Sequence, residues 1–439
     1  MKLYNELKLR FEQPIWALHP ELALFDTILD KNPEFVNFVE KDVLKGLKNN
    51  SMGRKDTPTV EQVLRAAIYK EIKRLDYRDL AVSFYDSISF KIFMKLDGRK
   101  GFSHSVLQKY ISKIKEENIR KIIVEINKIA VTEGVEDVSK VSTDTTSVET
   151  NVHYPTNNSL IMDCIKVATR LLKKVKKDNK DEQDRFDNRQ REAKKLNFQI
   201  NNTKKDGQKT LFDMYLVQLK NIISEVKENI GNGLAQGKIL KELTSFLPKM
   251  ETVYTNSYRY QIEGKKVENA EKIFSIHETH TDILVKGQRD IEFGHKVLIT
   301  RGNSTIILDY SIHKGNPNDK NLLIPSIDKV IENYTVIPGS TSNDGGFASQ
   351  DNLDKCKKRG IVNTVFTKVT KSLKNIATSP EVEKMLKKWR GTTEAVISNL
   401  KRGFGLSRVI WEGWGKFQAK VAWSILCYNL RVISNRLFA

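Results

Sequence analysis

The stretch VSKVSTDTTSVET, residues 138–150, decides the fold because strand signals first replace helix signals there. It is rich in valine and threonine, which favour strands, and it alternates as a strand does. Asp144 lies in the middle of this stretch. The first predicted strand of the chain therefore carries a carboxylate.

Strand and helix signals alternate again in the carboxyl-terminal part of the chain. Two apolar runs, 296–302 and 305–312, are split by Gly302-Asn303, a dipeptide typical of hairpin turns. After them we predict, in order, helix 321–334, strand 335–344, helix 348–360, strand 361–368 and helix 389–405. With the first strand in front, this order predicts an α+β or α/β domain with a mixed sheet, the layout of a ribonuclease H-like domain.

Residues 1–135 are expected to form a helical, helix-turn-helix-like DNA-binding region. Thr59 and Gln62 make a capping box at the start of one helix. Ser103 can cap another, whose exposed polar and basic residues would be His104, Gln108, Lys109 and Lys113. A DNA-recognition helix presents such a set to a groove, and the solvated face of an ordinary helical bundle gives the same pattern.

A long polar segment separates the first strand from the hairpin. We expect residues 136–439 to form the ribonuclease H-like domain, interrupted at about 165–265 by a helical insertion. Runs such as 171–196 and 211–230 suit an extended helical hairpin or coiled arm. Both signs of charge are mixed along these runs, so we expect the helices to expose a solvated surface.

The charge balance favours a polyanionic partner. The 439 residues include 74 Lys+Arg against 54 Asp+Glu, a formal charge of +20. Nucleic acid is the leading candidate for such a chain, and binding should then depend on salt. A general abundance of lysine, spread over the whole surface, is the alternative explanation.

Cysteine usage and hydropathy indicate a cytoplasmic protein with no membrane partner. Cys164, Cys356 and Cys427 are widely spaced, which predicts neither a disulfide framework nor a zinc site. The first 16 residues lack the apolar core of a signal peptide, and the sequence has no apolar run of bilayer length. Association with chromosomal DNA would follow from DNA binding.

Three acids fall at related places in the predicted layout. Asp144 lies in the first strand, Asp344 just after the fourth, and Glu394 in the last helix. In a ribonuclease H-like sheet the first and fourth strands are neighbours and that helix packs beside them, so the acids should converge. Converging carboxylates repel, and a hard divalent cation is their usual justification. We therefore predict a site for two Mg²⁺ ions, with Mn²⁺ as a substitute, that serves phosphoryl transfer.

Each acid also has a simpler explanation. Asp144 can make local hydrogen bonds at a strand end, and Asp344 with Gly345 and Gly346 can be a turn. Glu394 can be the surface partner of Arg390 four residues earlier, worth about 0.3–0.5 kcal/mol. Their combined order along the predicted strands favours the metal site.

The predicted helix 389–405 also carries cations beside its acid. At 100° per residue, Arg390, Glu394 and Lys401 fall on one stripe, opposite an apolar seam. Such a face lets the cations hold a phosphate backbone while the carboxylate holds a metal. The DNA-binding candidates are Arg390, Lys401, Arg402, Gln108, Lys109 and Lys113.

Four blocks resemble those of bacterial insertion-sequence DDE transposases. They are VSTDTTSVETNVHYPTNNSL, GNPND, TSNDGGFASQDNL and WRGTTEAVISNLKRGFGLSRVIWEGW. Arg390, Glu394 and Lys401 match the R-x3-E-x6-K part of a signature seen in many of these transposases. The tyrosine expected three residues before the arginine is missing, because position 387 is lysine.

The resemblance, over roughly residues 57–435, implies a DNA transposase with a ribonuclease H-like core. It implies metal-dependent cleavage at transposon ends and strand transfer, with Asp144, Asp344 and Glu394 as catalytic and metal-binding residues. The implied partners are double-stranded DNA, as terminal inverted repeats and target, and further copies of the chain in a homodimer or higher oligomer. Two alternatives are a non-catalytic, transposase-derived DNA-binding regulator and a nuclease without strand transfer.

Overall fold

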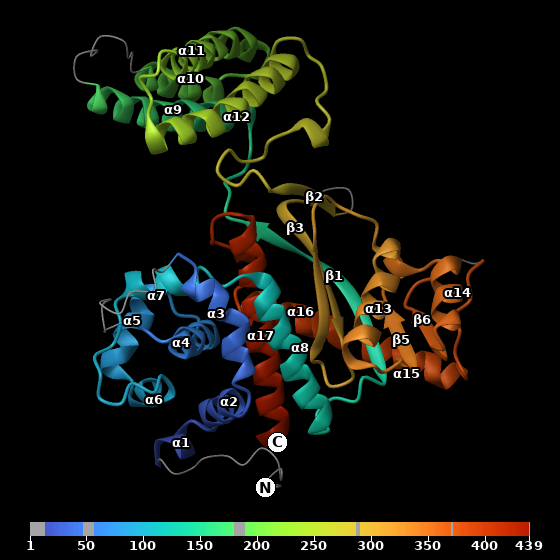
Figure 1. The fold of residues 1–439 in the computed structure, drawn as a ribbon. Coiled ribbons are helices and arrows are strands. Elements are labelled where there is room, and N and C mark those ends of the chain that lie inside the picture. Colours follow the sequence, from blue (N-terminus) through green and yellow to red (C-terminus); the bar gives the residue numbers. More distant parts are fainter. Residues whose placement is uncertain (1–13, 47–56, 180–188, 287–289, 370–371, 439) are drawn as a thin grey trace. The chain divides into compact units, whose positions relative to one another are not determined.

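The computed structural model describes residues 14–46, 57–179, 189–286, 290–369 and 372–438 (Figure 1). The chain divides into two compact units. Unit 1 comprises Met1–Thr150 and Gly294–Ala439, and unit 2 comprises Asn151–Phe293. The amino-terminal residues 1–13, where no signal peptide was predicted, and segment 180–188 of the polar run lie outside the described residues.

Unit 1 begins with short helices. They are α1 Pro14–Leu18, α2 Pro20–Lys31, α3 Glu34–Leu44, α4 Val60–Lys73, α5 Tyr77–Asp86, α6 Ile88–Phe93, α7 His104–Ile111 and α8 Glu116–Thr132. The predicted capping box is confirmed: the Thr59 hydroxyl accepts from the Gln62 backbone, and the Gln62 side chain accepts from the Thr59 backbone. Asp76 caps α5 in a similar way, accepting from the amides of Arg78 and Asp79. These caps explain why the helices begin where they do.

A mixed sheet follows the helices, which makes the fold α+β. Its strands are β1 Lys140–Thr150, β2 Asp282–Lys286, β3 Asp290–Arg301, β4 Ile307–His313, β5 Ser340–Asn343, β6 Asn363–Phe366 and β7 Arg408–Val409. In the described residues the order is β2-β3-β1-β5-β6, with β4 paired to β3 and β7 paired to β1. β1 is antiparallel to β3 and parallel to β5, and the predicted β3–β4 hairpin at Gly302-Asn303 is confirmed. β1 therefore lies between strands of opposite direction.

The later helices of unit 1 are α13 Leu323–Tyr334, α14 Gln350–Lys358, α15 Pro380–Arg390, α16 Thr392–Gly403 and α17 Trp414–Phe438. The prediction of one continuous helix over 389–405 was wrong. The chain leaves α15 at Arg390 and enters α16 at Thr392, with Gly391 between them. Glycine weakens helices, and the Thr392 hydroxyl donates to the Trp389 carbonyl at 2.9 Å, where the helix ends.

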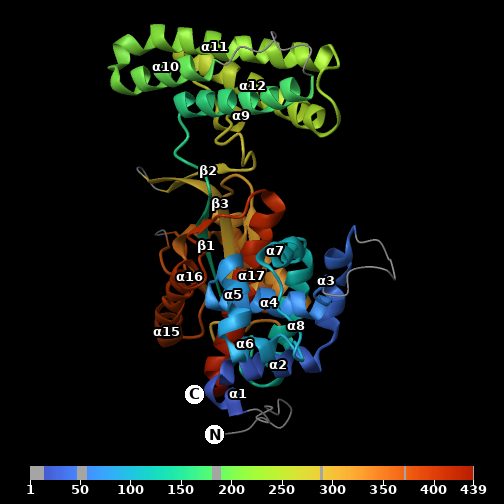
Figure 2. The ribbon, with the colours of Figure 1, turned by 90° about the vertical axis from the view of Figure 1, so that its left-hand side faces the viewer.

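One hydrophobic core runs through unit 1 and joins the amino-terminal helices to the sheet. It includes Phe35 of α3, Ile122 of α8, Ile307 of β4 and Trp423 of α17. Helices α8 and α17 lie side by side (Figures 1 and 2). Because these helices and the sheet share a core, the boundary predicted at residue 135 is not visible as a separation and stays a prediction.

Unit 2 contains helices α9 Asn157–Asp178, α10 Gln190–Asn202, α11 Lys205–Gly231 and α12 Gly237–Gln261 (Figure 2), and its range also includes strand β2 and the first residues of β3. The helices lie alongside one another and bury a core of their own, including Ile165, Tyr215, Leu219 and Met250. The expected extended arm is therefore a packed helical unit. Each helix has an apolar stripe along one face. Packing the helices together removes these stripes from water, which stabilises the unit.

None of the described helices combines the length and the apolar character needed to cross a bilayer. Cys164, Cys356 and Cys427 are all buried free thiols.

Candidate active site

The three predicted acids are carried by adjacent elements of unit 1. Asp144 lies in β1, Asp344 directly follows β5, and Glu394 lies in the first turn of α16. β1 and β5 are parallel neighbours that pair Lys140 with Ser340 and Val141 with Thr341. In this register Asp144, within β1, lies level with Asp344, which comes just after β5.

Asn343 connects β1 to β5 where their backbone pairing ends. Its side chain is fully buried, and its Oδ1 accepts a hydrogen bond from the Thr143 amide at 2.8 Å. Its Nδ2 donates to the Thr341 hydroxyl at 2.9 Å. A buried backbone amide without a hydrogen-bond partner would cost free energy. Asn343 therefore stabilises β1 and β5 at the positions next to Asp144 and Asp344.

The guanidinium of Arg390 brings the three carboxylates together. Its Nη2 lies 2.8 Å from Oδ2 of Asp144 and 3.8 Å from Oδ1 of Asp344. Its Nη1 donates to Oε1 of Glu394 at 2.9 Å. Three acids that are distant in the sequence therefore converge on one cation at the end of α15.

The three carboxylates differ in their surroundings. Burial raises the pKa of Asp144, although the charge of Arg390 and the Thr145 amide oppose that shift. Burial would also raise the pKa of Asp344, but a hydrogen bond from the Thr367 hydroxyl and the charge of Arg390 help to bring it below its ordinary value. The Glu394 side chain is 70% exposed. The site therefore runs from a buried acid to one that faces solvent.

A fourth acid, Asp319, lies beside this group and was not predicted as a site residue. It forms an ion pair with Lys296 of β3 at 2.8 Å and accepts a hydrogen bond from the Thr145 hydroxyl at 3.3 Å. A Cβ added to Gly346 would meet its carboxylate at 3.1 Å, so glycine lets the loop after Asp344 pass close by. The GNPND turn was the available sequence signal for this residue.

The donor chemistry of the three acids fits a hard divalent cation, because carboxylate oxygens are the ligands that Mg²⁺ and Mn²⁺ prefer. As the acids stand, no three described His, Cys, Asp or Glu side chains are grouped closely enough to ligate one ion. Arg390 stands between the carboxylates, and its Nε is buried without a hydrogen-bond partner. Metal binding would therefore require this guanidinium to withdraw.

The basic residues predicted beside Glu394 lie farther along the same helix. Lys401 and Arg402 are in the last turn of α16, about two helical turns from Glu394. The backbone carbonyl of Arg402 accepts a hydrogen bond from Arg74 at the end of α4, at 2.7 Å. This contact links an amino-terminal helix to the helix that carries the third acid.

The predicted DNA contacts in the amino-terminal region fall into two groups. Gln108 and Lys109 are exposed on α7. Lys113 lies beyond the end of α7, and its ammonium donates to the carbonyls of Val43 at 3.0 Å and Lys45 at 2.8 Å. Because Lys113 satisfies carbonyls at the end of α3, its contacts are those of a residue that stabilises the fold.

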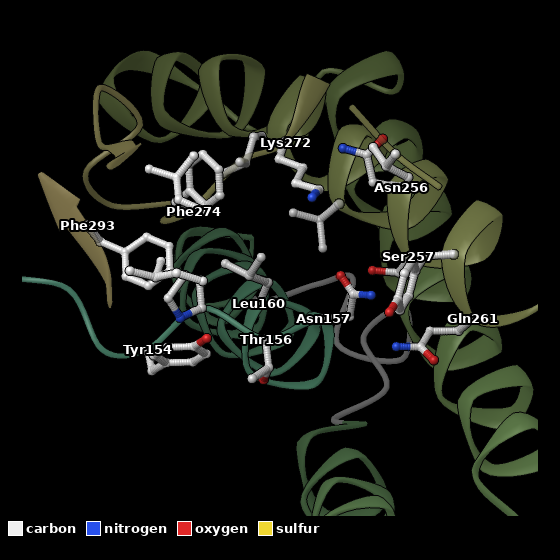
Figure 3. Close-up of a pocket in the computed structure, with 17 residues that line it drawn as sticks. Tyr154, Thr156, Asn157, Leu160, Asn256, Ser257, Gln261, Lys272, Phe274 and Phe293 are labelled. Atoms are coloured by element: carbon white, nitrogen blue, oxygen red, sulfur yellow. The ribbon is translucent and has the colours of Figure 1, made fainter. Parts of the chain in front are cut away.

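A pocket in unit 2 lies outside this group of acids. It has a volume of about 370 Å³ and is lined by Tyr154, Asn157, Lys272 and Phe293 among others (Figure 3). Its lining residues all come from 154–293, and none of the three acids is among them.

Comparison with known proteins found a family match over part of the chain. Residues 280–430 match the family model described as the transposase DDE domain. The matched segment includes Asp344, Arg390 and Glu394, whereas Asp144 on β1 precedes it. No curated protein and no solved structure matches the chain.

Proposed function

We propose that this chain, which carries a transposase DDE domain in residues 280–430, cleaves DNA at the ends of a mobile element and joins those ends to target DNA. The observation that carries the proposal is the convergence of Asp144, Asp344 and Glu394 on the single guanidinium of Arg390. Two of these acids lie within the matched domain, and the third lies on the strand parallel to β5.

Asp144 would hold both divalent cations, and Asp344 and Glu394 would each complete the binding of one. Mg²⁺ or Mn²⁺ bound there would activate the attacking oxygen and stabilise the leaving oxygen. Water would attack first and leave a 3′-hydroxyl at the element end. That hydroxyl would then attack a phosphorus of the target strand, so that one P–O bond forms and another breaks.

Arg390 would exchange its partners during this cycle. Its guanidinium suits carboxylate and phosphate oxygens equally well, because both accept paired N–H donors. When DNA enters, Arg390 would bind a phosphate near the scissile bond, with Lys401 and Arg402 on the backbone farther along. Gln108 and Lys109 of α7 would contact the element end, and two or more copies of the chain would hold two ends.

The test uses DNA that flanks the gene. The purified chain is footprinted on those flanks and then incubated with Mg²⁺ or Mn²⁺ and a target plasmid. A transposase gives protected ends, metal-dependent 3′-hydroxyl nicks and joined products. Protection without nicking would identify a DNA-binding regulator, and nicking without joined products a nuclease.

A further inference from the structure

Arg301, at the end of β3, is a fully buried arginine that contacts the segment carrying two of the site residues. Its Nε donates to the Thr393 hydroxyl at 2.7 Å, and its Nη2 donates to the Trp389 carbonyl at 2.7 Å. Its guanidinium also lies 3.9 Å from the centre of the Trp389 ring. Arg301 thus holds the residue immediately before Arg390 and the residue immediately before Glu394.

These contacts fall on both sides of the break between α15 and α16. Trp389 is in the last turn of α15, where carbonyl groups lack helical partners, and Thr393 is in the first turn of α16. A single planar guanidinium that binds both sides fixes the angle between the two helices. Arg390 and Glu394, which form an i,i+4 ion pair across this junction, each follow one of the two residues that Arg301 binds.

The contact continues to the strand that carries Asp144. The Thr393 hydroxyl donates to the Ser142 hydroxyl at 2.9 Å, and Ser142 precedes Asp144 by two residues in β1. Arg301, Thr393 and Ser142 are all fully buried. The chain of hydrogen bonds therefore runs from β3 through α16 to β1 without exposure to solvent.

The charge of Arg301 is not explained by an ion pair. Among the described residues no carboxylate lies within ion-pair distance of it, and its donors go to carbonyl and hydroxyl oxygens. Burial lowers its pKa to about 10, so it remains charged at neutral pH. A buried unpaired cation is costly, and an apolar side chain of similar size would avoid that cost. The guanidinium instead supplies N–H donors in the two directions needed to reach the Thr393 hydroxyl and the Trp389 carbonyl.

We infer that Arg301 is a positioning residue, which fixes the junction of α15 and α16 so that Glu394 is held with Asp144 in the group of acids. This inference rests on the proposed function of that group as a divalent-cation site. Arg301 does not touch the reacting atoms and acts through Trp389 and Thr393.

The experiment measures Mn²⁺ binding to the full chain without DNA, by electron paramagnetic resonance. Arg301→Lys keeps the charge but cannot make the paired contacts, and it should weaken Mn²⁺ binding by about 10-fold or more, as loss of a supporting contact to a metal ligand typically does. Arg65→Lys is the matched control. Arg65 is also fully buried, but it lies in α4 and pairs with Asp26 and Asp30, so this variant should bind Mn²⁺ as the wild type does.

A second pair of variants covers the case in which Arg301→Lys does not fold. Thr393→Val removes the hydroxyl that joins Arg301 to Ser142 and should weaken Mn²⁺ binding severalfold, whereas Thr393→Ser keeps the hydroxyl and should restore it. Equal Mn²⁺ affinity in wild type, Thr393→Val and any folded Arg301→Lys would overturn the inference. Failure of the wild type itself to bind Mn²⁺ would instead refute the proposed metal site on which the inference rests.

Discussion

Nη2 of Arg390 lies 2.8 Å from Oδ2 of Asp144, and both side chains are largely buried, with 12% and 15% exposure. The same guanidinium reaches Glu394 at 2.9 Å. A cation thus already balances the converging carboxylates in the protein alone. Under the proposed function, divalent metal and DNA together replace this arrangement. The three carboxylates then bind the metal, and the Arg390 guanidinium binds a DNA phosphate.

The first prediction concerns the three acids. Asp144→Asn, Asp344→Asn and Glu394→Gln should each reduce metal-dependent nicking by about 1000-fold or more, since removal of a group that stabilises transition-state charge has effects of this order. DNA binding, measured by gel shift, should persist. Asp351→Asn is the control, because Asp351 pairs with Lys355 on the exposed face of α14. Wild-type nicking by any of the three variants would remove that residue from the site.

The second prediction separates the two partners of Arg390. Arg390→Gln should strengthen Mn²⁺ binding by roughly threefold or more, because the carboxylates lose a competing cation. It should slow DNA nicking by at least about 10-fold, because a phosphate loses a bidentate donor. Calorimetry and a nicking assay measure the two effects. Lys387→Met removes a nearby cation that pairs with Glu383 and should change neither. Weaker Mn²⁺ binding in Arg390→Gln would contradict this account.

The third prediction uses Asp309, a buried carboxyl of β4. Burial raises its pKa to about 6 from an ordinary 3.8, although the charge of Arg120 opposes the shift. The folded chain then binds more protons than the unfolded chain between these pH values. The contribution of Asp309 to stability therefore falls as pH rises from about 4 to 6, by on the order of 2–3 kcal/mol, and is constant above.

Asp309→Asn removes this titration, while Arg120 keeps its ion pair with Glu116 at 2.8 Å. The difference in Tm between variant and wild type should shift in favour of the variant as pH rises from 4 to 7. Thermal melts at several pH values measure it. A difference that does not change with pH would show that Asp309 is ionised normally in the fold.

The fourth prediction distinguishes two lysines near α7. Lys109→Ala should weaken DNA binding and lower its salt dependence by about one charge, as expected for a phosphate contact. Lys113→Ala should mainly lower the Tm, because two carbonyls at the end of α3 lose their donor. Gel shifts at several salt concentrations and thermal melts measure these effects. If Lys113→Ala has the Tm of the wild type and Lys109→Ala binds DNA as tightly as the wild type, the assignment of the two roles is wrong.

The strands were predictable because their patterns are local. The alternation around Asp144 and the Gly302-Asn303 turn lie within a few residues of the structure that they specify, and β1 and the β3–β4 hairpin follow them. The two-residue strand β7 was not predicted, since its existence depends on pairing with β1. The helical insertion at about 165–265 was predicted, but the packing of its helices around a core of their own was not, because mixed surface charge concealed the apolar stripe on each helix.

The three acids were predicted to converge and the structure groups them around Arg390, but their role as a site stays a prediction. Asp144, Asp344 and Glu394 could be named because the order of the strands suggests which elements are neighbours. The Arg390–Glu394 pair follows the i,i+4 spacing seen in the sequence, whereas the contacts of Arg390 with Asp144 and Asp344 join elements that are distant along the chain. Arg301 gives no sequence signal as a positioning residue, because its partners Trp389 and Thr393 are about 90 residues away along the chain.

If Asp144, Asp344 and Glu394 together hold the divalent metal needed for DNA cleavage, loss of one of them should abolish cleavage. The most direct measurement is the Mn²⁺-dependent formation of 3′-hydroxyl ends on the DNA flanking the gene, compared between wild type and Asp144→Asn at equal DNA occupancy. The wild type should cleave the DNA only when metal is present, and the variant should not cleave it. Equal cleavage by wild type and Asp144→Asn would contradict it.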